Sequence, residues 1–223
     1  MMSLAFGPAV HMGGASPQVT VVYNGRTTSG ANPGATWSPT GVSIGTAATN
    51  RLVVIVITTN DSSARTFSSA TIASGATTNS GLKVSDDTFN SSVVASRTVA
   101  SGTTADMTVT CNAGPNTVNI DCYSLYCDTG ETISVKATAS DSNAISTTID
   151  FSFSGSVLIG GVQTPTSSGA HTPTGYTNDA DGVPIGNPRR SAGKNIVPTG
   201  SSHAISVANT GAEAVGSWAV FGV

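Results

Sequence analysis

The sequence predicts an all-β protein: an antiparallel β-sandwich of jelly-roll-like or Ig-like topology over residues 19–223, preceded by an N-terminal arm over residues 1–18. Three observations favour this fold class. Short segments in which apolar and polar residues alternate recur along the chain, as in half-buried strands. One run of six residues is apolar throughout. No segment of helical length carries an apolar stripe at the 3.6-residue period.

The apolar run is Leu52–Ile57, with the sequence LVVIVI. Its β-branched residues favour a strand, and six residues are few for a helix. Because both faces of this strand are apolar, we expect it to lie at the centre of the fold with cover on both sides. One cover is the opposing sheet of the sandwich. The other is a long loop or a second subunit.

The remaining strands are expected where alternation lies between turn-forming residues. Residues 1–17 show no period and contain several Gly and Pro, which indicates an arm. Before the first cysteine, alternation predicts strands at residues 19–23, 41–45, 67–73, 82–85 and 93–99. Farther on, the pattern predicts strands near residues 133–135, 149–153 and 157–159. No fixed-period repeat is visible, which argues against a β-helix or a propeller.

Apolar residues at alternate positions of two consecutive segments predict a hairpin with one buried face, and this pattern occurs twice. The apolar residues of 107–111 and those of 118–122 would form one buried face across a turn at 112–116. Ile205 and Val207 would pair with Trp218 and Val220 and close the sheet. Between these hairpins, Gly160-Gly161 predicts a bulge or bend, and residues 164–198 read as a long irregular stretch.

The composition argues against several classes of function. Only 9% of the residues are charged, and the formal net charge is −3, so no basic surface for nucleic acid is expected. Neither a signal peptide nor an apolar segment of membrane-spanning length is visible, so we expect synthesis in the cytosol and no membrane partner. Cys111, Cys122 and Cys127 lack the paired spacing of a zinc site. Buried free thiols are the favoured interpretation, with a disulfide or a reactive cysteine as the alternative.

Two acidic segments resemble known site motifs. Asp128-Thr129-Gly130 matches the short aspartic protease signature, but Glu131 follows where that family has a small apolar residue, so a strand-connecting turn is favoured. In residues 178–182, Asp179 and Asp181 are candidate Ca²⁺ ligands, because closely spaced oxygen-bearing side chains before a glycine suit hard cations. A polar turn is the favoured reading here too, and no cofactor is predicted.

No catalytic constellation is predicted, so we expect a protein that is not an enzyme. His11, His171 and His203 lie far apart in the sequence without neighbouring carboxylates, and no nucleophile elbow is present. Trp37 and Tyr176 lie in predicted loops and are candidate contacts for glycan rings. Trp218 shares parity with Val220 and is expected in the core.

The pattern of the chain resembles a group of virion proteins. The segments that carry the resemblance are Ile44–Thr49 followed by Asn50–Ile57, and Ser69–Gly75, set among Gly, Ser, Thr and Ala. Together with the aliphatic C-terminal strand, they look like small β-sandwich virion proteins of tailed bacteriophages and gene transfer agents, of capsid-decoration, head-spike or head-fibre type. The resemblance implies a structural protein located in the virion. It implies other virion proteins as partners and a homo-oligomer, with a homotrimer expected first. It carries no catalytic residues.

Host surface polysaccharide is a further expected partner, because a spike also serves host attachment. The competing class is a carbohydrate-binding module or tail-tip adhesin without catalytic activity. A polysaccharide hydrolase is the third class, and it would need two convergent carboxylates.

Overall fold

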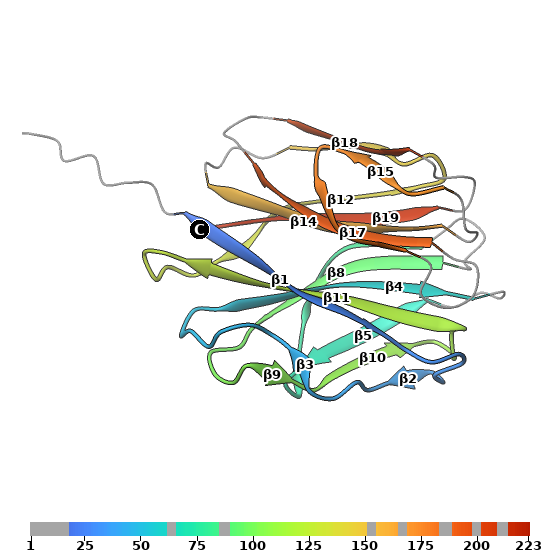
Figure 1. Ribbon diagram of the computed structural model, residues 1–223, viewed down its shortest axis with the longest axis horizontal. Coiled ribbons are helices and arrows are strands. Elements are labelled where there is room, and N and C mark those ends of the chain that lie inside the picture. Colours follow the sequence, from blue (N-terminus) through green and yellow to red (C-terminus); the bar gives the residue numbers. More distant parts are fainter. Residues whose placement is uncertain are drawn as a thin grey trace, which may run out of the picture.

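The computed structural model describes residues 18–61, 66–84, 90–150, 155–164, 169–182, 189–197, 202–208 and 214–223. Within these residues every regular element is a β-strand and every pairing is antiparallel, which confirms the predicted all-β sandwich class. The strands form stacked layers, with two inner sheets between two outer sheets (Figure 1). The predicted arm, residues 1–18, lies outside the described residues except for Gln18.

The first half of the chain forms inner sheet 1 and outer sheet 1. Inner sheet 1 consists of β1 (Val19–Thr28), β4 (Leu52–Asn60), β7 (Thr78–Val84), β8 (Asn90–Thr98) and β11 (Thr117–Cys127). Their order in space is β1-β11-β4-β8-β7. Outer sheet 1 consists of β2 (Thr36–Trp37), β5 (Phe67–Ile72), β6 (Gly75–Ala76) and β10 (Met107–Cys111), in the order β2-β10-β5-β6. A separate pair, β3 (Val42–Ser43) and β9 (Thr104–Ala105), packs against the apolar core between inner sheet 1 and outer sheet 1.

The second half forms inner sheet 2 and outer sheet 2. Inner sheet 2 consists of β12 (Ser134–Ser142), β14 (Ser156–Thr164), β16 (Thr177–Gly182), β17 (Arg189–Val197) and β19 (Val215–Gly222). Their order in space is β12-β19-β14-β17-β16. Outer sheet 2 consists of β13 (Ser146–Ile149), β15 (Thr172–Thr174) and β18 (His203–Ala208), in the order β13-β18-β15.

The two halves repeat one topology. When β3, β6 and β9 are set aside, each strand of the first half has a counterpart of the same rank in the second, and the counterparts occupy the same places in both inner and both outer sheets. Each half pairs its first strand with its last, its second with its seventh and its third with its sixth. This is the pairing of a jelly roll, a long hairpin wound into two sheets. The predicted sandwich therefore occurs twice. The sequence shows no matching repeat, because the two halves have the same topology but different sequences.

The edge strands of the inner sheets repeat as well. In the first half the register shifts between Tyr23 and Gly25 of β1 and between Ser80 and Lys83 of β7. The counterparts β12 and β16 carry shifts in their own pairings. Such irregularities bend an edge strand and make it a poor template for uncontrolled pairing.

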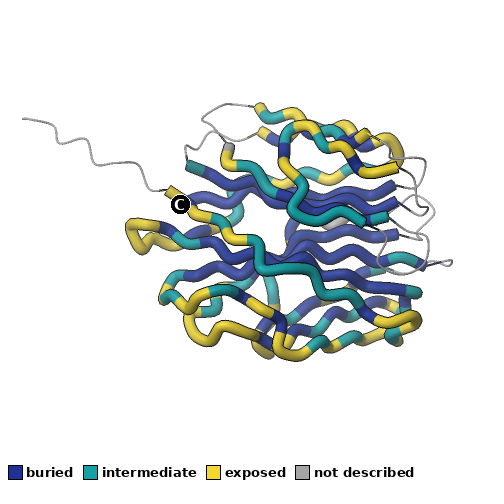
Figure 2. Tube along the Cα trace, in the orientation of Figure 1, coloured by how far each residue is buried: buried dark blue, intermediate teal, exposed yellow. Residues whose placement is uncertain are grey.

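Three apolar cores separate the four layers. Val53, Ile55 and Ile57 of β4 point toward outer sheet 1, whereas Leu52, Val54 and Val56 point toward inner sheet 2. From the sequence we expected a long loop or a second subunit as the second cover of this strand. That expectation is wrong, because the second cover is a sheet of the same chain. The third core lies between inner sheet 2 and outer sheet 2. Figure 2 shows the inner strands mainly buried, with the exposed residues gathered on the outer layers and connections.

Both predicted hairpins are wrong in their pairing. β10 pairs with β2 and β5 in outer sheet 1, whereas the following strand β11 pairs with β1 and β4 in inner sheet 1. Likewise β18 pairs with β13 and β15, and β19 with β12 and β14. The predicted buried faces are nevertheless correct, because each pair of consecutive strands faces one shared core from opposite sheets.

Gly160 and Gly161 form no bulge, since β14 keeps a continuous register with both neighbours. A Cβ at Gly160 would lie 2.1 Å from Cδ1 of Trp218, and one at Gly161 would lie 2.8 Å from Cγ1 of Val56. These glycines therefore make room for the indole ring on one face and for the approach of β4 on the other. The stretch 164–198, predicted to be irregular, contains β15, β16 and β17.

Val54 tests the importance of the central interface. We expect Val54→Asp to reduce the free energy of unfolding by more than about 3 kcal/mol, because it buries a carboxylate without a partner between two apolar faces. Val22→Asp introduces the same group at a site that is 43% exposed, and its effect should stay within about 1 kcal/mol. Urea unfolding of both variants measures the difference, and equal effects would contradict the central role of β4.

Candidate functional site

A groove lies where edge strand β1 of inner sheet 1 meets strands β16 and β17 of inner sheet 2. Its volume is about 470 Å³. The lining residues are Gln18, Val19, Thr20 and Val21 from the start of β1, and Thr177, Asp179, Lys194, Asn195 and Ile196 from the other sheet. The groove therefore brings together segments from the two ends of the chain.

The groove combines one ion pair with an apolar rim. Nζ of Lys194 contacts Oδ1 of Asp179, so these charges neutralise each other. Nδ2 of Asn195 donates to the carbonyl of Gly175 at 3.0 Å. Ile196 is 62% exposed, the largest value among the large apolar side chains of the described residues. These groups suit recognition by hydrogen bonds and apolar contact, and no nucleophile paired with a base lines the groove.

The phenol of Tyr123 lies close to the groove. Tyr123 is fully buried on β11, and burial, reinforced by the nearby carboxylates of Asp121 and Asp179, raises its pKa well above the ordinary value. The phenol therefore stays protonated. It can take part in hydrogen bonds, but it does not act as a phenolate base or nucleophile. Its ring lies 5.1 Å from that of Tyr23, measured between centroids.

A smaller groove occupies the equivalent place on the opposite side of the molecule's internal repeat. Its volume is about 360 Å³, and its lining comes from Leu52 of β4 and from β7, β8 and the region of β12, the last three being the counterparts of β16, β17 and β1. Nη1 of Arg97, which lines it, donates to the carbonyl of Ala73 at 2.8 Å. The first groove differs by its greater volume and its exposed isoleucine.

The structure does not bring Asp179 and Asp181 together as ligands of one ion. Asp179 is paired with Lys194, and Asp181 accepts two hydrogen bonds from Arg189, at 2.9 and 2.8 Å. Both residues lie in strand β16 and not in the polar turn predicted. No group of three potential metal-ligating side chains occurs in the part of the chain that the structure describes.

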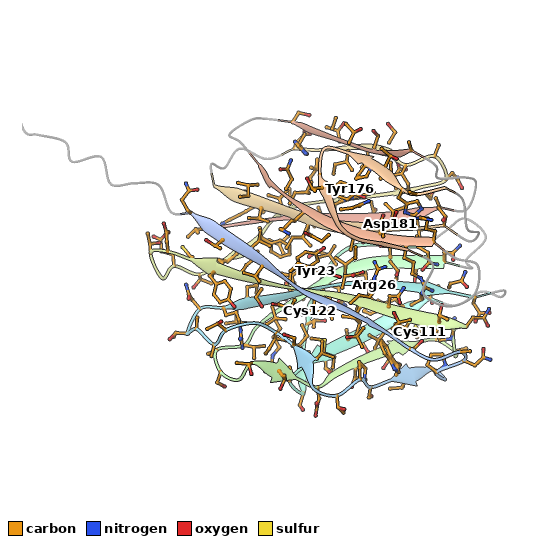
Figure 3. All side chains as sticks on the ribbon, in the orientation of Figure 1. Tyr23, Arg26, Cys111, Cys122, Tyr176 and Asp181 are labelled. Atoms are coloured by element: carbon orange, nitrogen blue, oxygen red, sulfur yellow. The ribbon has the colours of Figure 1, made fainter. Side chains whose placement is uncertain are left out.

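The two candidate aromatic residues have different fates. Tyr176 is only 6% exposed and packs in the third core, 6.4 Å from the ring of Trp218, so its ring is not available to a sugar and that prediction is wrong. Figure 3 shows Tyr176 among the strands of the second half. Trp37 lies in strand β2, opposite Val109, and is partly buried against the first core. Trp218 is buried, as predicted.

The sequence did not predict a cluster around His171, because no carboxylate adjoins this histidine in the sequence. Nδ1 of His171 lies 2.9 Å from Oγ of Ser191 and 3.9 Å from Oδ1 of Asp181, and Nε2 lies 3.3 Å from Oγ1 of Thr164. His171 and Ser191 are almost completely buried. A substrate cannot reach this serine, so the cluster connects β14, β16 and β17 and is structural.

The cysteines are buried free thiols and the Asp-Thr-Gly segment is a connecting turn, as predicted. All three cysteines are free and buried, and burial raises the pKa of Cys111 to about 11 and that of Cys122 to about 12, which makes these two thiols poor nucleophiles. Asp128 and Thr129 form a turn between the two halves. Oδ1 of Asp128 accepts a hydrogen bond from the backbone N–H of Gln18 at 3.0 Å.

Comparisons with protein-family models, curated proteins and solved structures found no match to this chain. No helix long and apolar enough to cross a membrane occurs in the described residues.

His171 predicts a pH dependence of stability. Burial lowers its pKa to about 4 from the ordinary 6.5, and the nearby Asp181 opposes this only in part. Between these values the unfolded chain takes up a proton that the native protein does not, so stability should fall as the pH drops from 6.5 to 4. His171→Gln should remove up to about 3 kcal/mol of that fall. Parallel pH slopes of unfolding free energy for the two proteins would refute this.

Proposed function

We propose that this chain is a non-catalytic structural subunit of a phage or phage-like particle, of capsid-decoration, head-spike or fibre type. The observation that carries the proposal is the duplicated jelly roll, because jelly rolls are recurrent building blocks of viral shells. The sparse charge of the chain adds support, since it leaves a Ser/Thr-rich outer surface suited to exposure on a particle.

The groove beside β1 supplies a means of assembly. Gln18, the first described residue, lines this groove, and it is the residue to which the segment of residues 1–17 is joined. We propose that this segment of one copy binds in the groove of a neighbouring copy and that a homotrimer results. The exposed Ile196 and the edge of β1 at residues 19–21, which lie before the register shift, provide the two elements of such recognition, an apolar contact and backbone hydrogen-bonding groups.

Analytical ultracentrifugation tests this assembly. The full chain should sediment as a trimer, and deletion of residues 1–17 should give a folded monomer. Ile196→Asp should also give a monomer because the substitution places a charge in the groove. Val22→Asp is the matched control, since Val22 is exposed but does not line the groove, and it should remain trimeric. A monomeric full chain at high concentration would rule out the assembly.

Particle association is tested separately. Particles released by cells that carry this gene should be purified on a density gradient and labelled with an antibody against the chain. The proposal expects co-migration of the chain with the particles and many symmetric copies on the shell by electron microscopy. Labelling of a few copies at a tail tip would favour an adhesin, and absence from the particles would overturn the proposal.

Carbohydrate binding is the second candidate function, in a spike or in a separate binding module. The observation that favours it is the partly exposed indole of Trp37 on outer sheet 1, since tryptophan faces stack on sugar rings. We expect Trp37→Ala to abolish retention on a glycan array and Trp37→Phe to retain part of it. Unchanged binding by Trp37→Ala would exclude this residue as the platform.

A further inference from the structure

The interface between the two inner sheets changes character along its length. One end is apolar and is built around Val54, Val56 and Ile159. At the other end the facing residues are polar and buried: Thr58, Asn119 and Asp121 from inner sheet 1, and Gln163 and Arg190 from inner sheet 2. Arg26 of β1 lies at the margin of this polar end, and Figure 3 shows it along the strand from Tyr23.

Arg190 is fully buried and incompletely bonded. Its Nε donates to Oε1 of Gln163 at 2.9 Å, and its Nη2 contacts Oγ1 of Thr117, while Nη1 has no partner. The other fully buried arginine, Arg51, is different. Its guanidinium donates to five backbone carbonyls at 2.9 to 3.0 Å, which solvate its charge.

Among the described residues, the polar end carries an excess of positive charge. Arg26 and Asp121 form a bidentate ion pair, with the closest contact at 2.8 Å, and Tyr23 donates a further hydrogen bond to the same carboxylate at 2.9 Å. Asp121 also attracts Arg190 at longer range, so this one carboxylate is shared between two guanidinium groups. Burial lowers the pKa of Arg190 to about 9, so its guanidinium remains charged at neutral pH. A buried charge whose counter-ion is already paired with another cation is unfavourable.

Further unpartnered polar atoms lie on the face of inner sheet 1 that carries Thr117, the contact of Arg190. Both amide atoms of Asn119 and Oγ1 of Thr58 are buried without a hydrogen bond. Asn119 and Thr58 are direct cross-strand neighbours on β11 and β4. Thr117, which holds the Arg190 guanidinium, lies two residues before Asn119 on the same face of the strand. The face of inner sheet 1 that contacts Arg190 through Thr117 thus also presents an amide and a hydroxyl without partners.

We propose that the polar end of this interface is a buried binding site for a small inorganic anion of the size of chloride, held by Nη1 of Arg190, Nδ2 of Asn119 and Oγ1 of Thr58. Each of these atoms donates a hydrogen bond, which is what a halide requires. A water molecule would satisfy the same atoms but would leave the excess charge uncompensated. The site is independent of the proposed role in a particle.

Chloride dependence of stability tests the site. The unfolding midpoint should rise with the logarithm of the chloride concentration when sodium chloride replaces sodium gluconate at constant ionic strength, because an anion that binds only the native state stabilises it by mass action. Arg190→Gln should abolish this rise. Arg189→Gln is the matched control at the adjacent residue, whose guanidinium is paired with Asp181, and it should retain the rise. A wild-type midpoint that does not respond to chloride would overturn the proposal.

Bromide provides a test that needs no variant. Crystals of the wild-type protein grown in sodium bromide should show an anomalous peak within hydrogen-bonding distance of Nη1 of Arg190. A peak there supports the site even if Arg190→Gln fails to fold. Density for a water at this position without an anomalous signal, or a direct bond from Nη1 to Asn119, would refute it.

Discussion

Burial of both faces of β4 is the constraint on which the rest of the structure depends. Each face carries branched apolar side chains, so the strand is stable only between two other layers. A single jelly roll supplies one such layer. The second comes from the other half of the chain, which repeats the topology and contributes β14 with its own two buried faces. The stack of four layers follows, and it ends at the outer sheets because their far faces are polar.

The sequence predicted the strands and their buried faces far better than their partners. Alternation identifies which side of a strand is apolar, and it did so correctly for β10, β11, β18 and β19. It cannot tell whether two consecutive strands share a ladder or face each other across a core, since both arrangements bury the same parity. In a jelly roll the second arrangement is common, because the chain passes repeatedly between sheets. β16 escaped detection because its residues, TNDADG, form a polar edge strand without alternation.

The candidate groove could not be read from the sequence at all. Its walls come from segments about as far apart in the chain as Val19 and Lys194, and only the face-to-face packing of the two halves brings them together. Asp179 was noticed, but for a local motif, whereas its partner Lys194 lies on the neighbouring strand. Tyr176 was misplaced for a related reason. It follows Gly175, whose φ of +91° suits a turn, yet its side chain folds back onto Trp218.

The polar end of the interface performs a task that the apolar end cannot. Two apolar sheets in contact fix their separation, but dispersion forces discriminate poorly among small shifts of one sheet along the other. Gln163 resists such shifts, because its side-chain amide donates to the backbone carbonyl of Thr59 at 2.6 Å and to the side chain of Asn90 on the opposing sheet. Ser92 and Ser217 add a bond between their hydroxyls at 2.7 Å. These directional contacts hold the two jelly rolls at one offset, and the buried charge of Arg190 is the electrostatic cost of that specificity.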